Sequence, residues 1–286
     1  MDALLAWYEP RRRAYPWRTA RDPYRILVAE VMLQQTQAAR VVRAYRAFLH
    51  RFPSLRVLAA APRAEVLRAW SGLGYNRRAA LLHEAARRIV RDHGGRVPDD
   101  PATLRRLPGV GAYTAAAVAA IAFGVAVPAI DVNVARVVVR ARLGEERATV
   151  AAVRRAARAW LDGHDPAAWN QALMDLGREV CRPLPRCGEC PLAEGCLARG
   201  RGALERPGDR PRRPGAPFEG SFRQARGRVL RAALAGVATL ARLATETGEP
   251  LDRVAAAVAA LARDGLLEAG PAALAGRPSG RVRPVG

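Results

Sequence analysis

The chain has 286 residues, half of them hydrophobic and only 6% aromatic, a length that suits two or three domains. Alanine is the commonest residue type, which favours a core of close-packed helices. The 47 basic residues, all of them arginine, outnumber the 26 acidic ones and give a formal net charge of +21. This excess points to a polyanionic partner, most simply nucleic acid, with a membrane surface as the alternative.

Several classes of protein are excluded by what the sequence lacks. No uncharged apolar run reaches the ~18 residues of a membrane span, and the first residues lack the layout of a signal peptide. We therefore expect a cytoplasmic, nucleoid-associated protein. The complete absence of lysine excludes a lysine Schiff base and a phosphate-binding P-loop lysine.

The first two thirds of the chain predict a succession of helices. Apolar residues recur at three- and four-residue spacing in seven segments, which are 24–50, 63–70, 76–93, 112–123, 132–142, 149–161 and 166–180. Proline and glycine punctuate the intervals between them. Residues 125–130 contain a proline and are expected to form an extended link between helices rather than a strand.

The remaining third divides into three parts by composition. Residues 199–219 are rich in Arg, Pro and Gly and predict a linker. Helical periodicity returns in 220–268, where three short helices indicate either a helix-turn-helix or winged-helix module or a plain three-helix bundle. Residues 269–286 are expected to be a disordered tail.

A glycine-rich turn precedes the segment 112–123. It reads Leu107-Pro108-Gly109-Val110-Gly111, and Gly109 and Gly111 would allow close approach of a ligand to the main chain. The free amides at a helix start favour an anion such as a DNA phosphate. The alternative is an ordinary helical hairpin that needs glycine for steric reasons.

Two carboxylates are candidates for acid–base chemistry. Glu30 lies on a mostly apolar helical face, where poor solvation would raise its pKa and suit a general acid. Asp131 opens the segment 132–142, where a helix N-terminus favours the ionised form. Taken singly, Glu30 could also be a surface acid or the partner of a buried arginine, and Asp131 could be only an N-cap.

All four cysteines of the chain, Cys181, Cys187, Cys190 and Cys196, fall within residues 181–196. Two disulfides would suit a secreted chain, which nothing else here indicates. The spacing therefore predicts one four-thiolate site, and it favours a [4Fe–4S] cluster slightly over zinc, whose sites usually show two short-spaced pairs.

Together these features resemble the helix-hairpin-helix DNA glycosylases, and specifically the MutY-type adenine glycosylases. The resemblance runs from about Ala6 to Cys196. It is carried by the four cysteines and by the blocks Pro16–Arg18, Glu30–Gln37, Gly72–Tyr75, Leu107–Gly111, Asp131–Val137 and Asn170–Gly177. The segment from Met32 to Thr36 is the one that favours the adenine branch.

The resemblance implies roles for individual residues. Glu30 matches the acid that protonates N7 of a flipped adenine, and Asp131 matches the carboxylate that stabilises an oxocarbenium-like sugar. Asn133, Tyr113 and Arg18 match positions that support these two.

Further residues match positions that contact DNA or the base. Tyr75 resembles the wedge beside the mispaired base, Gln35 with its neighbour Thr36 resembles the group that enters the stack, and Gln171 matches a position near the adenine. The turn residues Leu107, Gly109, Val110 and Gly111 match the DNA-binding hairpin.

The fold implied is all-α, with two domains, an iron–sulfur loop and a small C-terminal helical, winged-helix-like module. Residues 23–130 would form the hairpin domain, and residues 1–22 would join 131–198 in the domain that holds the cluster. The chain departs from the family in two ways: five residues rather than six separate Cys181 from Cys187, and 220–268 is too short for the usual Nudix-like β domain.

The expected activity is removal of adenine mispaired with 8-oxoguanine or guanine in double-stranded DNA, by a monomer. The reaction would be monofunctional, because Tyr113 stands where bifunctional members have their lysine. Two alternatives remain: a mismatch glycosylase of the same fold for thymine, uracil or a deaminated purine, and a non-catalytic iron–sulfur DNA-binding regulator.

Overall fold

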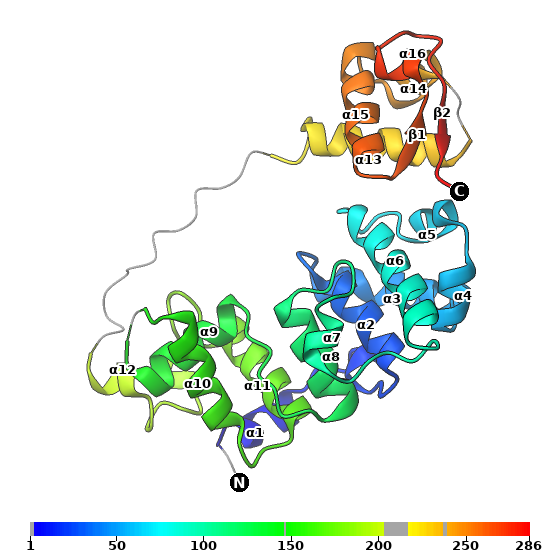
Figure 1. Ribbon diagram of the computed structural model, residues 1–286. Coiled ribbons are helices and arrows are strands. Elements are labelled where there is room, and N and C mark those ends of the chain that lie inside the picture. Colours follow the sequence, from blue (N-terminus) through cyan, green and yellow to red (C-terminus); the bar gives the residue numbers. More distant parts are fainter. Residues whose placement is uncertain (1–2, 146, 203–216, 237–238) are drawn as a thin grey trace. The chain divides into compact units, whose positions relative to one another are not determined.

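The computed structural model describes residues 3–145, 147–202, 217–236 and 239–286, which are mainly helical (Figure 1). The α-helices are α1 Ala3–Tyr8, α2 Pro23–Leu33, α3 Ala38–Arg51, α4 Leu55–Ala60, α5 Arg63–Ala69, α6 Arg77–Asp92, α7 Pro101–Leu104, α8 Ala112–Phe123, α9 Val132–Val138, α10 Val150–Leu161, α11 Pro166–Glu179, α12 Leu197–Gly200, α13 Phe222–Leu234, α14 Leu240–Thr247, α15 Leu251–Arg263 and α16 Pro271–Leu274. The other elements are the 3-10 turns η1 Glu9–Arg11, η2 Pro16–Arg18 and η4 Cys187–Glu189, the π-helical turn η3 Val139–Leu143, and the strands β1 Leu267–Ala269 and β2 Val282–Pro284.

By its internal contacts the chain forms two compact units. The first comprises residues 1–30 and 97–212, and the second comprises 31–96 and 213–286. The glycine-rich turn therefore lies in the same unit as the cysteine segment, whereas the sequence analysis assigns it to a separate domain 23–130. The link at 125–130 has no strand, as expected. Most of the expected linker, residues 203–216, lies outside the described residues.

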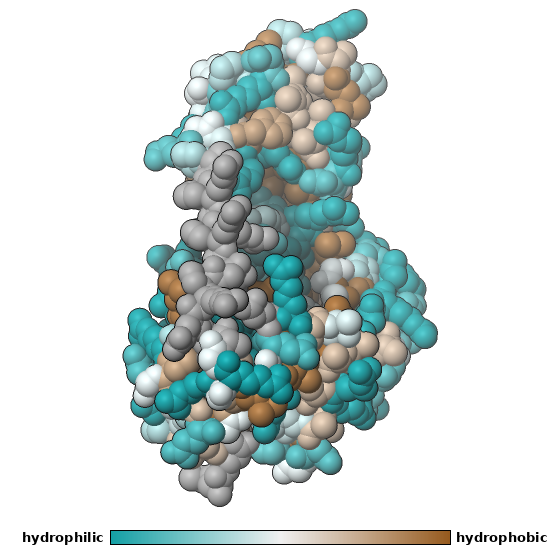
Figure 2. Space-filling view, turned by 90° about the vertical axis from the view of Figure 1, so that its left-hand side faces the viewer, coloured by the Kyte–Doolittle hydropathy of each residue, from teal (hydrophilic) through white to brown (hydrophobic). Residues whose placement is uncertain are grey.

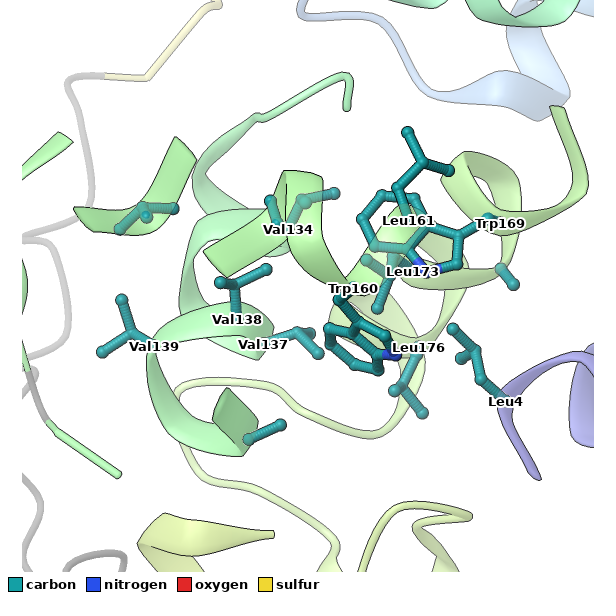
Figure 3. Packing of buried hydrophobic residues seen from close by; sticks show 14 of the residues in the cluster. Leu4, Val134, Val137, Val138, Val139, Trp160, Leu161, Trp169, Leu173 and Leu176 are labelled. Carbon is teal, nitrogen blue, oxygen red and sulfur yellow. The ribbon is translucent and has the colours of Figure 1, made fainter. Parts of the chain in front are cut away.

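The core of the first unit is built by α9, α10 and α11. Their apolar faces meet in one buried cluster, to which Leu4 of α1 also belongs (Figure 3). The rings of Trp160 and Trp169 meet edge to face with centroids 5.8 Å apart, a favoured aromatic geometry. Helix α8 is apolar on nearly all sides and is buried from Thr114 to Ala120, which its alanine-rich sequence permits.

The second unit contains a smaller aromatic core between α3 and the end of α5. The ring of Phe48 lies 4.9 Å from that of Phe52 and 5.9 Å from that of Trp70, measured between centroids. All three side chains are buried. Ser54 begins α4 as its N-cap, with the side chain accepting from the amide of Val57.

The prediction of one helix over 24–50 is wrong. The helix ends at Leu33 and a new one begins at Ala38, and between them Gln35 has a φ of 54°. A left-handed residue interrupts the α-helical ladder, but both flanking helices bury an apolar face. The apolar spacing therefore continues on both sides of residues 34–37, and the break between the helices cannot be seen in it.

The C-terminal residues form a small module of their own. Helices α13, α14 and α15 pack together, and β1 pairs with β2 in antiparallel register. An isolated bridge joins Thr239 to Arg281. Three helices with a β ribbon correspond to the winged-helix-like alternative and exclude the plain three-helix bundle.

The prediction of a disordered tail at 269–286 is also wrong. Val282 is 2% exposed, and the carbonyl of Gly280 accepts a hydrogen bond from the amide of Leu240 at 3.0 Å. A Cβ on Gly280 would stand 2.3 Å from the main chain of Ala273. The segment has few large apolar side chains, and main-chain hydrogen bonds contribute much of what holds it in place. Its composition therefore does not reveal that it is ordered.

The face in Figure 2 is covered largely by hydrophilic side chains, with apolar ones in scattered patches. In the described parts of the chain, no helix combines the length and the apolar character needed to cross a bilayer.

The packing of α9 on α11 depends on Gly177, and replacing it by alanine tests this. A Cβ there would lie 2.9 Å from both Cβ and the carbonyl oxygen of Asn133. We expect Gly177→Ala to destabilise the chain by about 1–3 kcal/mol, as overpacking does. Gly227→Ala on α13 is the matched control, because nothing lies within 4 Å of its Cβ. That variant should keep or gain stability, by up to about 1 kcal/mol. Equal denaturation midpoints for the two variants would contradict this.

Candidate active site

Glu30 lies near the end of α2, and its carboxyl is buried. The residue is only 7% exposed, and most of its neighbours in the helix are apolar. Burial raises the pKa of Glu30 to about 7, whereas a hydrogen bond with Tyr113 and the charge of Arg18 act in the opposite direction. The negative charge of Asp131 raises the pKa further. The carboxyl can therefore hold a proton near neutral pH, as the sequence analysis expects of a general acid.

Tyr113 stands at the start of α8, directly after the glycine-rich turn. Its hydroxyl donates to Sδ of Met174 at 2.7 Å and is also within hydrogen-bond reach of Glu30. Burial, followed by the negative charge of Glu30, raises the pKa of Tyr113 well above its usual value. The phenol therefore stays neutral and can act only as a hydrogen-bond group.

Asp131 is the N-cap of α9, and its carboxylate is tightly held. One oxygen accepts from the amides of Asn133 at 2.9 Å and Val134 at 2.8 Å, and the other accepts from Nδ2 of Asn133 at 2.9 Å. These three hydrogen bonds fix the orientation of the carboxylate at the start of α9. The N-cap interpretation of Asp131 is therefore confirmed, and it is compatible with a role toward a cation because the residue remains partly exposed.

Asn133 is itself held from the other side. Its Oδ1 accepts from Nη2 of Arg136 at 2.8 Å, and the same guanidinium donates to the carbonyls of Gly177 and Cys181, each at 2.7 Å. A chain of hydrogen bonds thus connects Asp131 to the first residue of the cysteine segment. The sequence analysis gives no role to Arg136, although it lies within the block 131–137.

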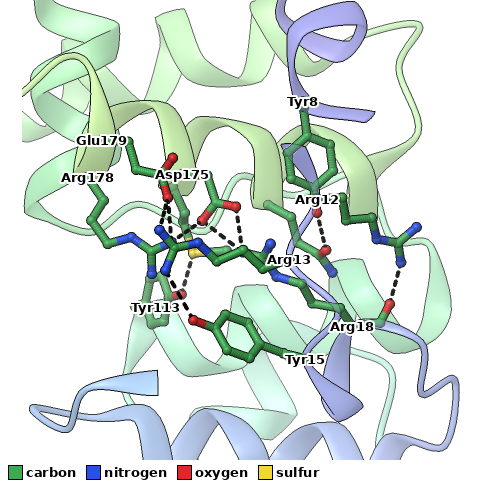
Figure 4. Close-up of polar contacts among 11 residues, drawn as sticks. Tyr8, Arg12, Arg13, Tyr15, Arg18, Tyr113, Asp175, Arg178 and Glu179 are labelled. Carbon is green, nitrogen blue, oxygen red and sulfur yellow. Dashed lines mark hydrogen bonds and ion pairs between the residues drawn. The ribbon is translucent and has the colours of Figure 1, made fainter. Parts of the chain in front are cut away.

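A buried ion pair lies beside these groups. Arg18 Nη2 contacts Oδ1 and Oδ2 of Asp175, each at 2.7 Å, and the two side chains are 8% and 5% exposed (Figure 4). Arg178 donates to the same carboxylate at 2.9 Å. Nη1 of Arg18 is buried and has no hydrogen-bond partner among the described residues. Asp175 is a site residue that the sequence does not single out, since its partner Arg18 lies 157 positions away.

Gln171 lies on α11 and is buried. Its Oε1 accepts from the hydroxyl of Tyr8 at 2.7 Å, across 163 positions of sequence. The contact leaves the amide nitrogen of Gln171 for another partner. Tyr8 is a further residue that the sequence does not single out.

The glycine-rich turn is anchored by its apolar side chains and exposes its glycines. Leu107 and Val110 are 5% and 6% exposed, while Gly109, with a φ of 76°, and Gly111 lie at the surface. The first amides of α8 have no acceptor within the helix. The amides of Leu107 and Val110 already donate to the carbonyls of Leu104 and Leu107, so an anion would meet the first amides of α8 instead.

Gln35, Thr36 and Tyr75 belong to the second unit. Gln35 and Tyr75 have φ values of 54° and 48° and are the non-glycine residues with positive φ among those described. Gln35 is exposed, and Tyr75 leaves 52% of its surface open to solvent. A large aromatic ring held outward on a strained backbone is unusual for a residue with only a packing role.

The four cysteines line a single pocket together with Arg140. Nη1 of Arg140 contacts Sγ of Cys181 at 3.8 Å, and its main-chain oxygen accepts from Sγ of Cys196 at 3.7 Å. Burial raises the pKa of Cys190 to about 11, so metal binding must displace a proton there.

The π-helical turn η3 carries Arg140 to this pocket, where Nη1 also donates to the carbonyl of Arg182 at 2.6 Å. In the described ranges, no three Cys, His, Asp or Glu side chains converge as ligands of a single metal ion.

The pKa of Glu30 makes stability depend on pH. Because the pKa of Glu30 in the folded chain is about 7 and its usual value is 4.5, the folded chain keeps a proton between these two pH values that the unfolded chain has lost. The stabilising contribution is therefore complete below pH 4.5 and is lost as pH rises through 7. Relative to wild type, Glu30→Gln should gain up to about 3 kcal/mol in unfolding free energy between pH 4 and pH 8. Urea denaturation across this range measures the gap, and parallel pH profiles would contradict the assignment.

Comparison with known proteins places the chain in a family. Residues 28–162 match the model of the HhH-GPD superfamily of base excision DNA repair proteins. The adenine DNA glycosylase of Mycobacterium tuberculosis (strain CDC 1551 / Oshkosh) is 48% identical over 233 residues, which cover 79% of this chain and 76% of that protein.

Two solved structures are similar as well. A thermostable thymine-DNA glycosylase has a TM-score of 0.65 at 33% identity, covering 70% of this chain and 94% of that one. Endonuclease III in a non-covalent complex with DNA has a TM-score of 0.60 at 25% identity, covering 71% and 95%. These relationships show that the chain is a member of the adenine DNA glycosylase family within the HhH-GPD superfamily.

Proposed function

We propose that the chain hydrolyses the N-glycosidic bond of adenine mispaired with 8-oxoguanine or guanine. The observation that carries the proposal is the buried carboxyl of Glu30, which has a pKa of about 7. This carboxyl lies beside Tyr113 and within electrostatic reach of Asp131. A protein that only binds DNA has no need of a buried acid protonated near neutral pH. The similarity to an adenine DNA glycosylase supports adenine as the base.

Glu30 acts as the general acid. It transfers its proton to N7 of the flipped adenine, so the electron pair of the C1′–N9 bond leaves with a neutralised base. The sugar is left as an oxocarbenium-like cation, and a water adds to C1′ and loses a proton. Tyr113, through its hydrogen bond, and Arg18, through its charge, lower the pKa of Glu30 and so partly offset the effect of burial.

Asp131 faces the developing sugar cation as a fixed negative charge. Its hydrogen bonds from Asn133 and from the start of α9 hold the carboxylate in one orientation, so no reorganisation is needed when the cation forms. Gln171 contacts the adenine through its amide nitrogen, since Tyr8 occupies the carbonyl oxygen.

The partner is duplex DNA at the nucleoid, bound by a monomer. Support comes from the net charge of +21 and from the similarity to a DNA-bound endonuclease III structure. The turn 107–111 presents phosphate to the first amides of α8, which directly follow it. The base stack of the DNA is contacted by Gln35, Thr36 and Tyr75, and these contacts help the target base to leave it.

The cysteine segment holds one [4Fe–4S] cluster. The four thiols around one pocket, with the guanidinium of Arg140 to balance anionic sulfur, suit such a group. The bound cluster would supply four metal–thiolate bonds that tie residues 181–196 into one loop, and no acid or base.

Two substitutions test the acid pair. Glu30→Gln removes the transferable proton and should slow single-turnover adenine release by ~10²–10⁴-fold while retaining duplex binding. Asp131→Asn removes the charge but remains a good N-cap, so a comparable loss would be chemical rather than structural. Asp165→Asn, at the N-cap of α11, is the matched control and should leave the rate unchanged.

The same assay discriminates the alternatives. A panel of duplexes should show release of adenine opposite 8-oxoguanine or guanine. Preferential release of thymine, uracil or a deaminated purine would replace adenine as the substrate, and no release of any base would favour the DNA-binding regulator.

The metal content tests the cofactor. Anaerobically purified protein should contain about four iron atoms per chain and absorb broadly in the visible range. Cys190→Ser should lower the iron content and the stability more than the chemical step, because the cysteines do not belong to the acid pair. Stoichiometric zinc without iron would overturn the assignment.

Strand cleavage tests whether the reaction is monofunctional. Tyr113 cannot form an imine, and the chain has no lysine to replace it. Borohydride added during turnover should therefore trap little covalent protein–DNA complex, and the abasic strand should break only on alkali treatment. Cleavage as fast as base release, with a strong trapped band, would refute this.

A further inference from the structure

Arg78 is a buried cation that the proposed reaction does not use. It lies in the first turn of α6 and is 8% exposed. Its Cζ lies between two aromatic groups, 5.4 Å from the ring centroid of Trp70 and 5.5 Å from that of Tyr75. Burial lowers the pKa of Arg78 from its usual value, which reflects how strongly the group is desolvated. Such a charge needs a full set of acceptors to remain in the interior.

The acceptors of Arg78 come from two separate segments of the second unit. Nη1 donates to the carbonyls of Val31 at 2.9 Å and Met32 at 3.0 Å, and also to that of Gln34. Nη2 donates to Oγ1 of Thr36 at 3.1 Å. These groups are the last carbonyls of α2 and the turn that follows it, where a helix leaves its acceptors unpaired and favours a positive charge.

The second segment is the turn before α6. Nη2 of Arg78 also donates to the carbonyl of Gly74 at 3.1 Å, and Nε donates to the carbonyl of Tyr75 at 3.4 Å. One planar guanidinium thus joins the turn 34–36 to the turn 74–75. An ammonium group could not do this, since it offers three donors on a point charge rather than a fork of five.

The two turns share a second property. Each contains a non-glycine residue in the left-handed region, Gln35 with a φ of 54° and Tyr75 with a φ of 48°. This conformation disfavours residues with a side chain and persists only where surrounding contacts impose it. Arg78 binds the carbonyl of Gln34 and the hydroxyl of Thr36 on either side of Gln35, and it binds the carbonyls of Gly74 and of Tyr75 itself. The guanidinium therefore opposes the relaxation of either turn.

We propose that Arg78 is a positioning residue that presets Gln35 and Tyr75 for entry into the DNA stack. The inference rests on the proposed function in one respect, namely that these two side chains touch DNA. Arg78 itself touches neither base nor phosphate. Its loss should impair unstacking of the target base and leave the acid pair of Glu30 and Asp131 intact.

The DNA experiment separates positioning from chemistry. In a Glu30→Gln background, a duplex with 2-aminopurine in place of the target adenine reports unstacking by a rise in fluorescence. Adding Arg78→Met should reduce that rise at least tenfold at saturating protein, and Arg78→Lys should give an intermediate value. Arg87→Met is the matched control, because it removes an exposed arginine from the same helix, and it should leave the rise unchanged.

A stability cycle tests the same idea without DNA. Glycine adopts a positive φ at little cost, so Gln35→Gly removes the strain that Arg78 is inferred to hold. Arg78→Lys should then shift the denaturation midpoint less in the Gln35→Gly background than in wild type. The lysine variant serves here in case Arg78→Met fails to fold.

Additive shifts in this cycle, or a folded Arg78→Met variant with a full fluorescence rise, would overturn the inference. Failure of the proposed function is distinguishable. In that case the Glu30→Gln protein with Arg78 intact would itself show no rise, while the stability cycle would still report on Arg78.

Discussion

The ion pair between Arg18 and Asp175 is the contact on which the rest of the acid site depends. It joins the N-terminal turn η2 to α11 with both side chains buried, and the same guanidinium carries the positive charge that lowers the pKa of Glu30. Removing one partner of a buried pair leaves an uncompensated charge. The resulting loss of stability is larger than the net stability that the intact pair contributes. Burial raises the pKa of Glu30, whereas the hydrogen bond with Tyr113 and then the charge of Arg18, which Asp175 holds in place, lower it.

Guanidinium groups that bind main-chain carbonyls recur beside the proposed functional groups. Arg136 joins Asn133 to the carbonyls of Gly177 and Cys181, Arg140 holds the start of the cysteine segment, and Arg78 joins two left-handed turns. The planar fork of arginine can satisfy several carbonyl oxygens at once. In a chain without lysine, arginine therefore supplies internal connection as well as surface charge, and the count of 47 overstates the charge available to DNA.

The two units contain different groups of proposed functional residues. The first unit contains Glu30, Asp131, the hairpin turn and the cysteine pocket, and the second contains Gln35, Thr36 and Tyr75. The boundary falls within α2, directly after Glu30. The proposed acid and the proposed stack-probing residues are thus a few positions apart in sequence but are stabilised by different sets of contacts.

Sequence alone determined the helical class, most helix positions after residue 60 and the grouping of the four cysteines, because periodicity, residue type and short spacing are local properties. It also predicted that the pKa of Glu30 would be raised, since an acid on an apolar helical face has few ways to stay solvated. Only the tertiary structure decided the break at 34–37 and the ordered segment 269–286, since a single left-handed residue and a few ladder hydrogen bonds leave no hydrophobic period. The same holds for Asp175, Tyr8 and Arg78, whose partners lie 157, 163 and up to 47 positions away. Contacts between such distant residues arise only when the chain has folded.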